Sequence, residues 1–224
     1  MGAQAPGSRF TGFNGAVKRL GVFIVAALVV AGCGGAGAER RVALSGVRAA
    51  APSCPAAART GWQRLANRID APVYCPSWMP DPLDGVIGSR WNNIDEVSRD
   101  RSYLMSWVWQ ETGPGAAGGE LHVNLRGYPD RIRIPRCVNA DSKKRELIPC
   151  FSDSAGRVRA AGVTATVYNV NQDADQWHVL YAWRYAGSLY TVSEHVAPPL
   201  NHRKVRRNLD RILRGLVLVQ PTEP

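Results

Sequence analysis

The sequence predicts an α+β domain built on a mainly antiparallel, curved sheet of about five to seven strands. Several segments alternate apolar and polar residues with the period of a strand, and no long helical segment lies between them. Parallel strands would need such crossover helices, so neighbouring strands are expected to run antiparallel. A short N-terminal helix and an amphipathic C-terminal helix packed on the sheet complete the prediction.

The N-terminus has the layout of an export signal. Lys18 and Arg19 precede an apolar stretch, residues 22–31, that is too short to span a bilayer in the usual way. The residues Val30-Ala31-Gly32-Cys33 resemble the bacterial lipobox. That resemblance implies cleavage before Cys33 and attachment of fatty acyl chains such as palmitate to it. An uncleaved membrane anchor and plain secretion are the alternatives that the sequence leaves open.

All three alternatives place the body of the protein outside the cytoplasm, because Lys18 and Arg19 hold the N-terminus inside. The expected organisation is a signal peptide with lipobox, or an anchor, over residues 1–33. A small-residue-rich tether follows over 34–58, and an extracytoplasmic domain over 59–220. The expected location is therefore extracytoplasmic and attached to the cell membrane.

The remaining cysteines predict a disulfide framework. With Cys33 set aside, an even number is left in an exported chain, and four cysteines allow three pairings. Pairing of neighbours is favoured, which gives Cys54–Cys75 and Cys137–Cys150. No CxxC motif is present, and the histidines at 122, 178, 195 and 202 are scattered along the chain. The sequence therefore predicts no metal site and no cofactor.

The domain is expected to open with a helix over about Thr60–Ile69. Thr60 and Gln63 fit a capping box, apolar residues follow at helical spacing, and Pro72 ends the helix. The proline-rich segment "APVYCPSWMPDPLDG" excludes a central strand and favours a rigid connector with an edge strand at Val73-Tyr74.

Strands are predicted wherever the alternation is regular. The segments are "SYLMSWVWQE", "ELHVNLRG", "GVTATVYNV", "QWHVLYAWRYAG" and "SLYTVSEHV". The last two are joined at Ala186-Gly187-Ser188, which predicts a hairpin turn. Cys137 and Cys150 bracket a polar loop between short apolar runs, so a second hairpin with a disulfide across its base is expected there.

The C-terminal segment predicts one amphipathic helix. Asn201 is placed to cap it, and the apolar stripe consists of Val205, Leu209, Ile212, Leu213 and Leu216. Arginines occupy most of the opposite face. A basic amphipathic helix can lie on a membrane surface, but the sheet needs a cover, which favours packing of this stripe on the sheet.

The sequence contains no assembled catalytic motif. It has no G-x-S-x-G, P-loop or Rossmann fingerprint, and the adjacent Glu194 and His195 are interpreted as an inert surface pair. Aromatic residues on neighbouring strands are expected either in the core or around an apolar groove between sheet and helix that holds a lipid or wall precursor. The groove candidates are Trp107, Trp109, Trp183 and Tyr190.

Two segments carry a family resemblance. "PVYCPSWMPDPLDG" and "AWRYAGSLYTV", with Trp183, Gly187 and Tyr190 at matching spacing, resemble an extracytoplasmic domain that follows the membrane segment of anti-sigma-factor-like or sporulation-associated proteins. The resemblance covers about residues 70–218 and departs at Pro82-Leu83. The whole chain resembles lipoproteins of GC-rich Gram-positive bacteria. Both resemblances imply a sensory, binding or scaffolding domain of the envelope and no catalytic residues.

The expected function is therefore that of a non-catalytic, membrane-tethered envelope lipoprotein that binds a lipid, a wall component or a protein partner. Its net charge of +10 suits an anionic surface, and export argues against nucleic acid as the polyanion. A single-pass anchored sensor domain and an unrecognised envelope hydrolase remain as alternatives.

Overall fold

The structure is a computed structural model that describes residues 50–83, 93–110, 120–139, 142–170 and 177–222. The predicted signal, the lipobox with Cys33 and most of the tether lie outside these residues. The described part is mainly antiparallel sheet with two helices, in agreement with the predicted fold class. None of its helices is both long and apolar enough to cross a membrane.

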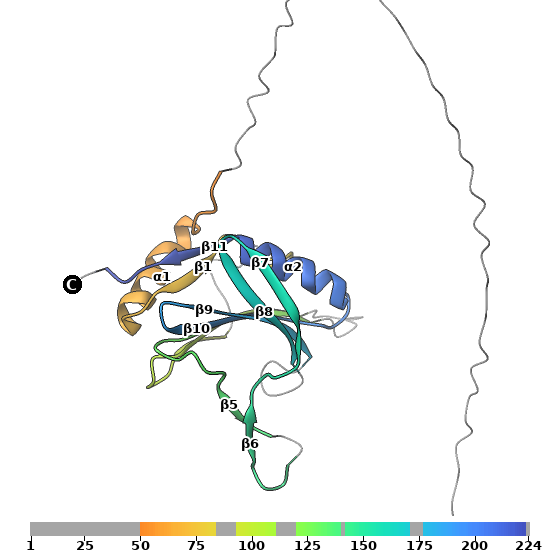
Figure 1. The fold of residues 1–224 in the computed structure, drawn as a ribbon. Coiled ribbons are helices and arrows are strands. Elements are labelled where there is room, and N and C mark those ends of the chain that lie inside the picture. Colours follow the sequence, from red (N-terminus) through yellow and green to blue (C-terminus); the bar gives the residue numbers. More distant parts are fainter. Residues whose placement is uncertain (1–49, 84–92, 111–119, 140–141, 171–176, 223–224) are drawn as a thin grey trace, which may run out of the picture. The chain divides into compact units, whose positions relative to one another are not determined.

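Seven of the described strands form one antiparallel sheet in the order β2-β3-β4-β10-β9-β8-β7. In that order the strands are Asn93–Val97, Tyr103–Gln110, Glu120–Tyr128, Ser188–His195, His178–Tyr185, Val163–Val170 and Ser154–Ala160. Two helices, α1 (Ala56–Ile69) and α2 (His202–Arg214), lie with the short pair β1–β11 on one side of this sheet (Figure 1). A second short pair, β5–β6, projects away on the other side (Figure 1).

Strand β10 lies at the centre of the sheet and is buried along almost its whole length. It pairs with β9 through a two-residue turn in which Ala186 and Gly187 have φ values of 45° and 76°. Positive φ at both positions is the geometry of the tight hairpin turn that matches the twist of the strands, so the predicted turn is confirmed. On its other edge β10 pairs with β4, far away in the sequence.

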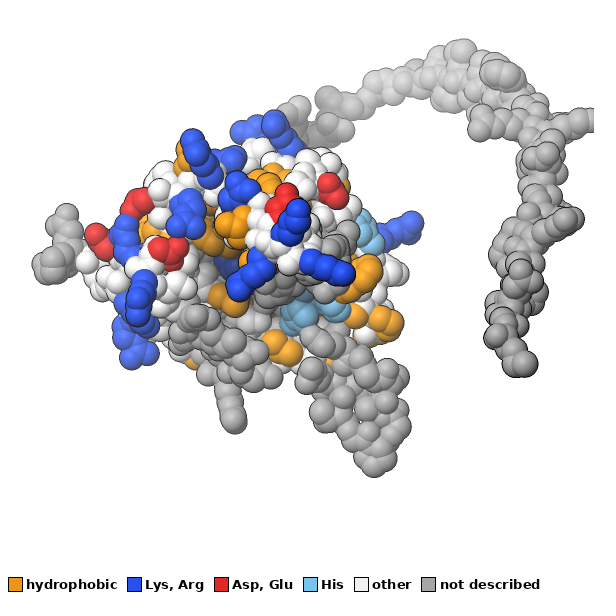
Figure 2. All heavy atoms as spheres, turned by 90° about the horizontal axis from the view of Figure 1, so that it is seen from below, with side chains coloured by type: hydrophobic (Ala, Val, Ile, Leu, Met, Phe, Trp, Pro, Cys, Tyr) orange, Lys and Arg blue, Asp and Glu red, His pale blue; other side chains and the backbone are white. Residues whose placement is uncertain are grey.

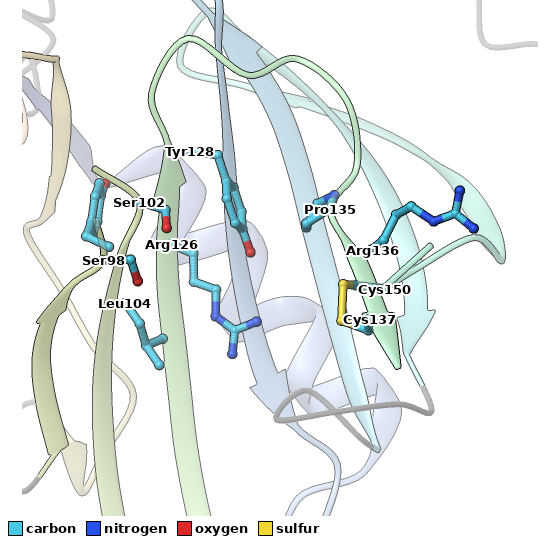
Figure 3. A pocket seen from close by; sticks show the side chains of 10 residues that line it. Ser98, Ser102, Leu104, Arg126, Tyr128, Pro135, Arg136, Cys137 and Cys150 are labelled. Carbon is cyan, nitrogen blue, oxygen red and sulfur yellow. A yellow bond between two sulfur atoms is a disulfide. The ribbon is translucent and has the colours of Figure 1, made fainter. Parts of the chain in front are cut away.

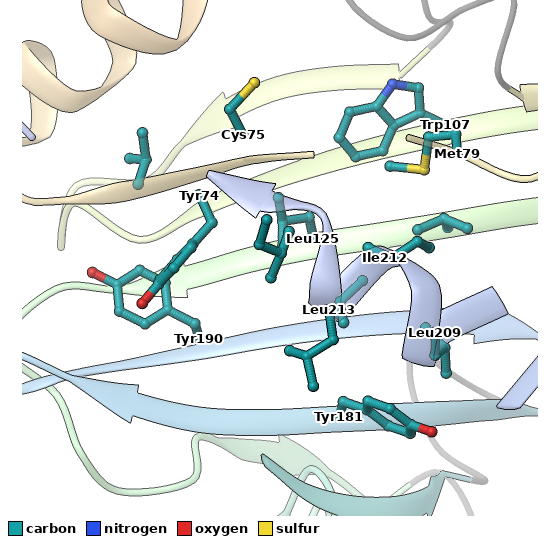
Figure 4. Packing of buried hydrophobic residues seen from close by; sticks show 14 of the residues in the cluster. Tyr74, Cys75, Met79, Trp107, Leu125, Tyr181, Tyr190, Leu209, Ile212 and Leu213 are labelled. Carbon is teal, nitrogen blue, oxygen red and sulfur yellow. The ribbon is translucent and has the colours of Figure 1, made fainter. Parts of the chain in front are cut away.

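The core lies between the sheet and α2. Leu209, Ile212 and Leu213 are fully buried, and Figure 4 shows them facing Leu125 of β4 and Tyr181 of β9. Burial of each such side chain contributes roughly 1.5–3 kcal/mol, so this stripe holds the helix on the sheet. As predicted, the side chain of Asn201 caps the helix by accepting a hydrogen bond from the Lys204 amide at 3.0 Å.

Both helices differ from the sequence prediction at one end. Helix α1 begins at Ala56, earlier than the predicted Thr60, and its N-cap is Pro55 without a side-chain cap. Helix α2 ends at Arg214 with Gly215 as its C-cap, so Leu216 leaves the predicted helical stripe and starts β11 (Leu216–Val219). Strand β11 pairs antiparallel with β1 (Val73–Pro76), because the β-branched residues after Gly215 favour an extended chain.

Two disulfides join the cysteines that the sequence analysis favours as partners. Cys54 bonds to Cys75 and links the chain before α1 to strand β1. Cys137 bonds to Cys150 and closes the hairpin of β5 (Arg136–Val138) and β6 (Leu147–Pro149). Each crosslink restricts the unfolded chain and stabilises the fold by about 2–4 kcal/mol.

Gly127 provides a direct test of the packing between β3 and β4. It is the cross-strand partner of Tyr103, and a Cβ at this position would overlap the tyrosine ring. We expect Gly127→Ala to lower the free energy of unfolding by about 1–3 kcal/mol, measured by urea denaturation. The control is Gly61→Ala in α1, where nothing lies within 4 Å and a helix former replaces glycine. Equal stability of wild type and Gly127→Ala would contradict this packing.

Candidate functional site

The sheet has two chemically different faces. Along β10, Tyr190, Val192 and Glu194 point towards the helices, and Asn208 of α2 donates a hydrogen bond to Glu194 at 2.7 Å. Because side chains alternate along a strand, Thr191, Ser193 and His195 lie on the opposite face. We call this second side, away from α2, the outer face.

One half of the outer face is apolar and covered. A small cluster of buried side chains on β8, β9 and β10 packs against residues that precede and follow the β5–β6 hairpin. Its buried members are Phe151, Val170, Leu180, Ala182 and Leu189, with Tyr128, Ile134, Cys150 and Tyr168 partly buried against them. The hairpin base is therefore fixed to the sheet by hydrophobic contact, while its disulfide holds β5 and β6 together.

A pocket of about 290 Å³ lies between strands β3 and β4 and the hairpin base. Figure 3 shows Arg126 and Tyr128 of β4 on one side of it and the Cys137–Cys150 disulfide on the other. The Arg136 guanidinium points away from this space and donates to the Leu147 carbonyl oxygen across the hairpin. The pocket is polar on its sheet side, which suits a small hydrophilic group better than an acyl chain.

The hairpin itself presents an amphiphilic surface to solvent. The cross-strand pair Val138 and Leu147 is 44% and 50% exposed, and Ile132 next to the hairpin is 52% exposed. Among the described residues from Ile132 to Pro149, Glu146 is the exposed acidic residue. The exposed cations of this stretch are Arg133, Arg136, Lys143, Lys144 and Arg145. Exposed aliphatic side chains among cations are typical of an interaction surface rather than of a solvated loop.

The outer face also gathers three of the chain's four histidines. His122 of β4, His178 of β9 and His195 of β10 have ligand nitrogens that lie within 4.8 Å of one another. Figure 2 shows histidine side chains together on this side of the molecule. Local ligand spacing in the sequence does not indicate this cluster, because the three residues come from three different strands.

Most of the residues predicted to line an aromatic groove lie in the core. Trp107, Trp183 and Tyr190 are almost completely buried, and Trp109 is 36% exposed. Trp107 stacks on Trp62 of α1 with ring centroids 6.4 Å apart, and Trp183 packs with Tyr74 and Tyr190. Packing in the core, the first of the two sequence interpretations, therefore describes Trp107, Trp183 and Tyr190 but not the partly exposed Trp109.

Glu194 and His195 do not face each other, because adjacent strand residues point to opposite faces. Burial beneath α2 raises the pKa of Glu194 to about 8, while the Asn208 hydrogen bond and the Lys204 charge lower it by less. The carboxyl is therefore mostly neutral at pH 7. It cannot form an acid–base pair with His195.

Comparison with known proteins found no matching family model, no similar curated protein and no similar solved structure. The resemblances drawn from the two sequence segments therefore remain predictions, and the site is interpreted from its own chemistry.

Glu194 makes stability depend on pH. Its pKa is about 8 in the folded protein and about 4.5 in an ordinary carboxyl group, so the unfolded chain releases this proton first. Its contribution to stability is full below pH 4.5 and is lost as the pH rises to 8. We expect Glu194→Gln, which keeps an acceptor for Asn208, to remove this loss.

The measurement is the urea midpoint of both proteins between pH 5 and pH 9 in buffer containing a chelator. The difference between wild type and Glu194→Gln isolates this carboxyl from every other titrating group. A difference that does not change across this range would contradict the buried, neutral carboxyl.

Proposed function

We propose that this protein is a membrane-tethered, non-catalytic lipoprotein of the cell envelope whose domain binds an anionic lipid surface through the β5–β6 hairpin. The observation that carries the proposal is the exposure of Val138, Leu147 and Ile132 among five cations on the projecting β5–β6 hairpin and the residues just before it. The lipid anchor on Cys33 and the extracytoplasmic location come from the sequence and form part of the proposal.

An anionic bilayer suits both parts of this surface. Each lysine or arginine close to an anionic membrane contributes roughly 1 kcal/mol, and their long side chains extend to the head groups. Aliphatic side chains at the same level enter the boundary between head groups and acyl chains, as in interfacial helices. A soluble polyanion such as a wall polymer would satisfy the cations and leave Val138 and Leu147 in water.

The hairpin is preorganised for such a contact. The Cys137–Cys150 disulfide and the bond from Arg136 to the Leu147 carbonyl oxygen hold β5 and β6 together, and the base packs on the sheet. A rigid element loses less conformational entropy on binding than a free loop would. The pocket beside Arg126 lies at this base and is open to a polar group from the same surface.

The tether makes a weak contact effective. From Cys33 to Ala50 the chain extends at most about 55–60 Å, enough for a domain of this size to turn either side to the membrane. A tethered domain meets the surface at a high effective concentration, so a few kilocalories per mole of interaction suffice.

The remaining alternatives have less support. The hydrolase hypothesis loses its only sequence candidates for an acid–base pair, because Glu194 and His195 lie on opposite faces of the sheet. An anchored sensor would require Met1 to Gly32 to remain on the mature protein.

We expect the hairpin of the full chain to be protected by anionic lipid. The chain is reconstituted in nanodiscs of neutral lipid or of neutral lipid with phosphatidylglycerol, and trypsin cleavage after Lys143, Lys144 and Arg145 is followed. Cleavage should slow in anionic discs and recover at high salt, because salt screens the contact. Val138→Ser with Leu147→Ser should weaken the protection without changing the charge.

The matched control for charge is a pair of double variants. Lys143→Glu with Lys144→Glu should abolish the protection, now read by hydrogen exchange of residues 131–149. Arg157→Glu with Arg159→Glu makes the same charge change at exposed positions of β7 and should retain it. Equal protection of the wild-type hairpin in neutral and anionic discs would refute the proposed contact.

The anchor has its own test in the intact mass of the protein purified from membranes of a bacterium that processes lipoproteins. We expect a chain that begins at Cys33 and carries added acyl mass. A chain that still carries Met1 to Gly32 would exclude lipobox processing and favour the anchored sensor.

A further inference from the structure

The three histidines form one row across the middle of the sheet. His195 of β10 is the cross-strand partner of His178 of β9. On the other side of β10, Glu194 pairs with Val123, so the next step of the same register brings His195 opposite His122. The row lies on the outer face, because the preceding residue of β10 points to α2.

The imidazole rings converge instead of standing parallel on their strands. His122 and His178 belong to strands separated by β10, so their backbones are about 9–10 Å apart. Their ring centroids are nevertheless only 4.4 Å apart, and they lie 4.7 and 5.0 Å from the ring of His195. The outer two side chains therefore lean inwards over the middle one and close a triangle.

Hydrophobic packing does not require histidine in this row. The same row continues at both ends with valine, Val108 beside His122 and Val170 beside His178. Apolar side chains are therefore accommodated at this level of the outer face. Three imidazoles within one triangle become mutually repulsive when protonated, which makes them a poor choice for packing alone in a chain of net charge +10.

The surroundings are shielded and polar. His178 is buried, and Nδ1 of His195 is shielded from solvent without a hydrogen-bond partner among the described residues. The next row along the strands contains buried Ser106, Asn124 and Ser193 and continues with Leu180 on β9, and the Ser106 hydroxyl donates to the Asn124 side-chain oxygen at 2.6 Å. Polar groups next to metal-ligating histidines are typical of metal sites.

We infer that His122, His178 and His195 form a binding site for one divalent transition-metal ion of the Zn²⁺ type. Three neutral imidazole nitrogens are the donor set of zinc sites that keep a fourth position for water or another ligand. The set contains no carboxylate or carbonyl oxygen, so Mg²⁺ and Ca²⁺ are excluded as occupants.

The geometry needs only a small adjustment to accept the ion. Tetrahedral ligands about 2.0–2.1 Å from zinc lie about 3.3 Å from one another. The present nitrogens lie within 4.8 Å, so side-chain rotations that move each ring by about 1 Å complete the site. The backbone is already fixed, because the three positions belong to paired strands at the centre of the sheet.

The site is separate from the membrane contact proposed above. His122 lies near the start of β4, whereas the hairpin follows Tyr128 at the other end of that strand, about 20 Å further along. Metal binding and lipid binding can therefore succeed or fail independently.

The test uses the full chain, purified in detergent without a histidine tag and stripped with a chelator. Titration with Zn²⁺ should show one bound ion per chain by native mass spectrometry and calorimetry. Co²⁺ should give the visible spectrum of a tetrahedral, nitrogen-ligated ion, and Mg²⁺ and Ca²⁺ should not bind. His122→Gln, His178→Gln and His195→Gln should each weaken Zn²⁺ binding by at least about 100-fold.

His202→Gln is the matched control. It changes the remaining histidine of the chain, which is exposed and bonds to Asn169 outside the cluster, and it should leave affinity unchanged. Absence of a stoichiometric Zn²⁺ ion in the wild type, or a Co²⁺ spectrum without nitrogen ligation, overturns the inference whether or not the variants fold. Equal affinity of wild type and a folded His195→Gln variant overturns it as well.

Discussion

The register of β10 between β4 and β9 is the constraint on which the rest of the structure depends. It places Tyr190 and Val192 under the helices and His195 on the outer face. A slip of one residue would exchange the two faces along the whole strand. Such a slip would bury His195 beneath α2 and would move Tyr190 and Val192 from the core to the outer face. The same pairing that seals the core therefore also aligns the three histidines.

Glu194 shows how strictly the two faces are separated. A carboxyl group under a helix is costly when charged, and here burial keeps it mostly neutral while Asn208 supplies one hydrogen bond. The helix that covers it is held by apolar contacts of Leu209, Ile212 and Leu213. The inner face thus keeps this buried carboxyl neutral, whereas the three histidines lie on the outer face of the sheet.

Local patterns in the sequence were sufficient for most elements of the fold. Alternation identified β3, β4, β8, β9 and β10, and the stripe with Asn201 identified α2, since each depends on residues close together in the chain. The ends of the helices were less predictable. The valines after Gly215 form a strand because β1 offers an edge to pair with, and α1 begins at Ala56 after Pro55, without a side-chain cap. Both depend on tertiary contacts that a local pattern does not contain.

The histidine cluster divides in the same way into a local and a non-local part. Counting outwards from the turn at Ala186-Gly187 leads to His178 and His195 as partners, so two of the three histidines follow from a hairpin that the sequence predicts. The third member depends on the pairing of β4 with β10, which joins segments separated by the hairpin, β7, β8 and β9. Such non-local pairing carries no signature in residue spacing. An ion held by all three histidines would stabilise the folded chain and not the unfolded chain, because the unfolded chain does not bring His122 close to the other two. Its binding energy would therefore reinforce the pairing of β4 with β10, which is the contact that the sequence predicts least well.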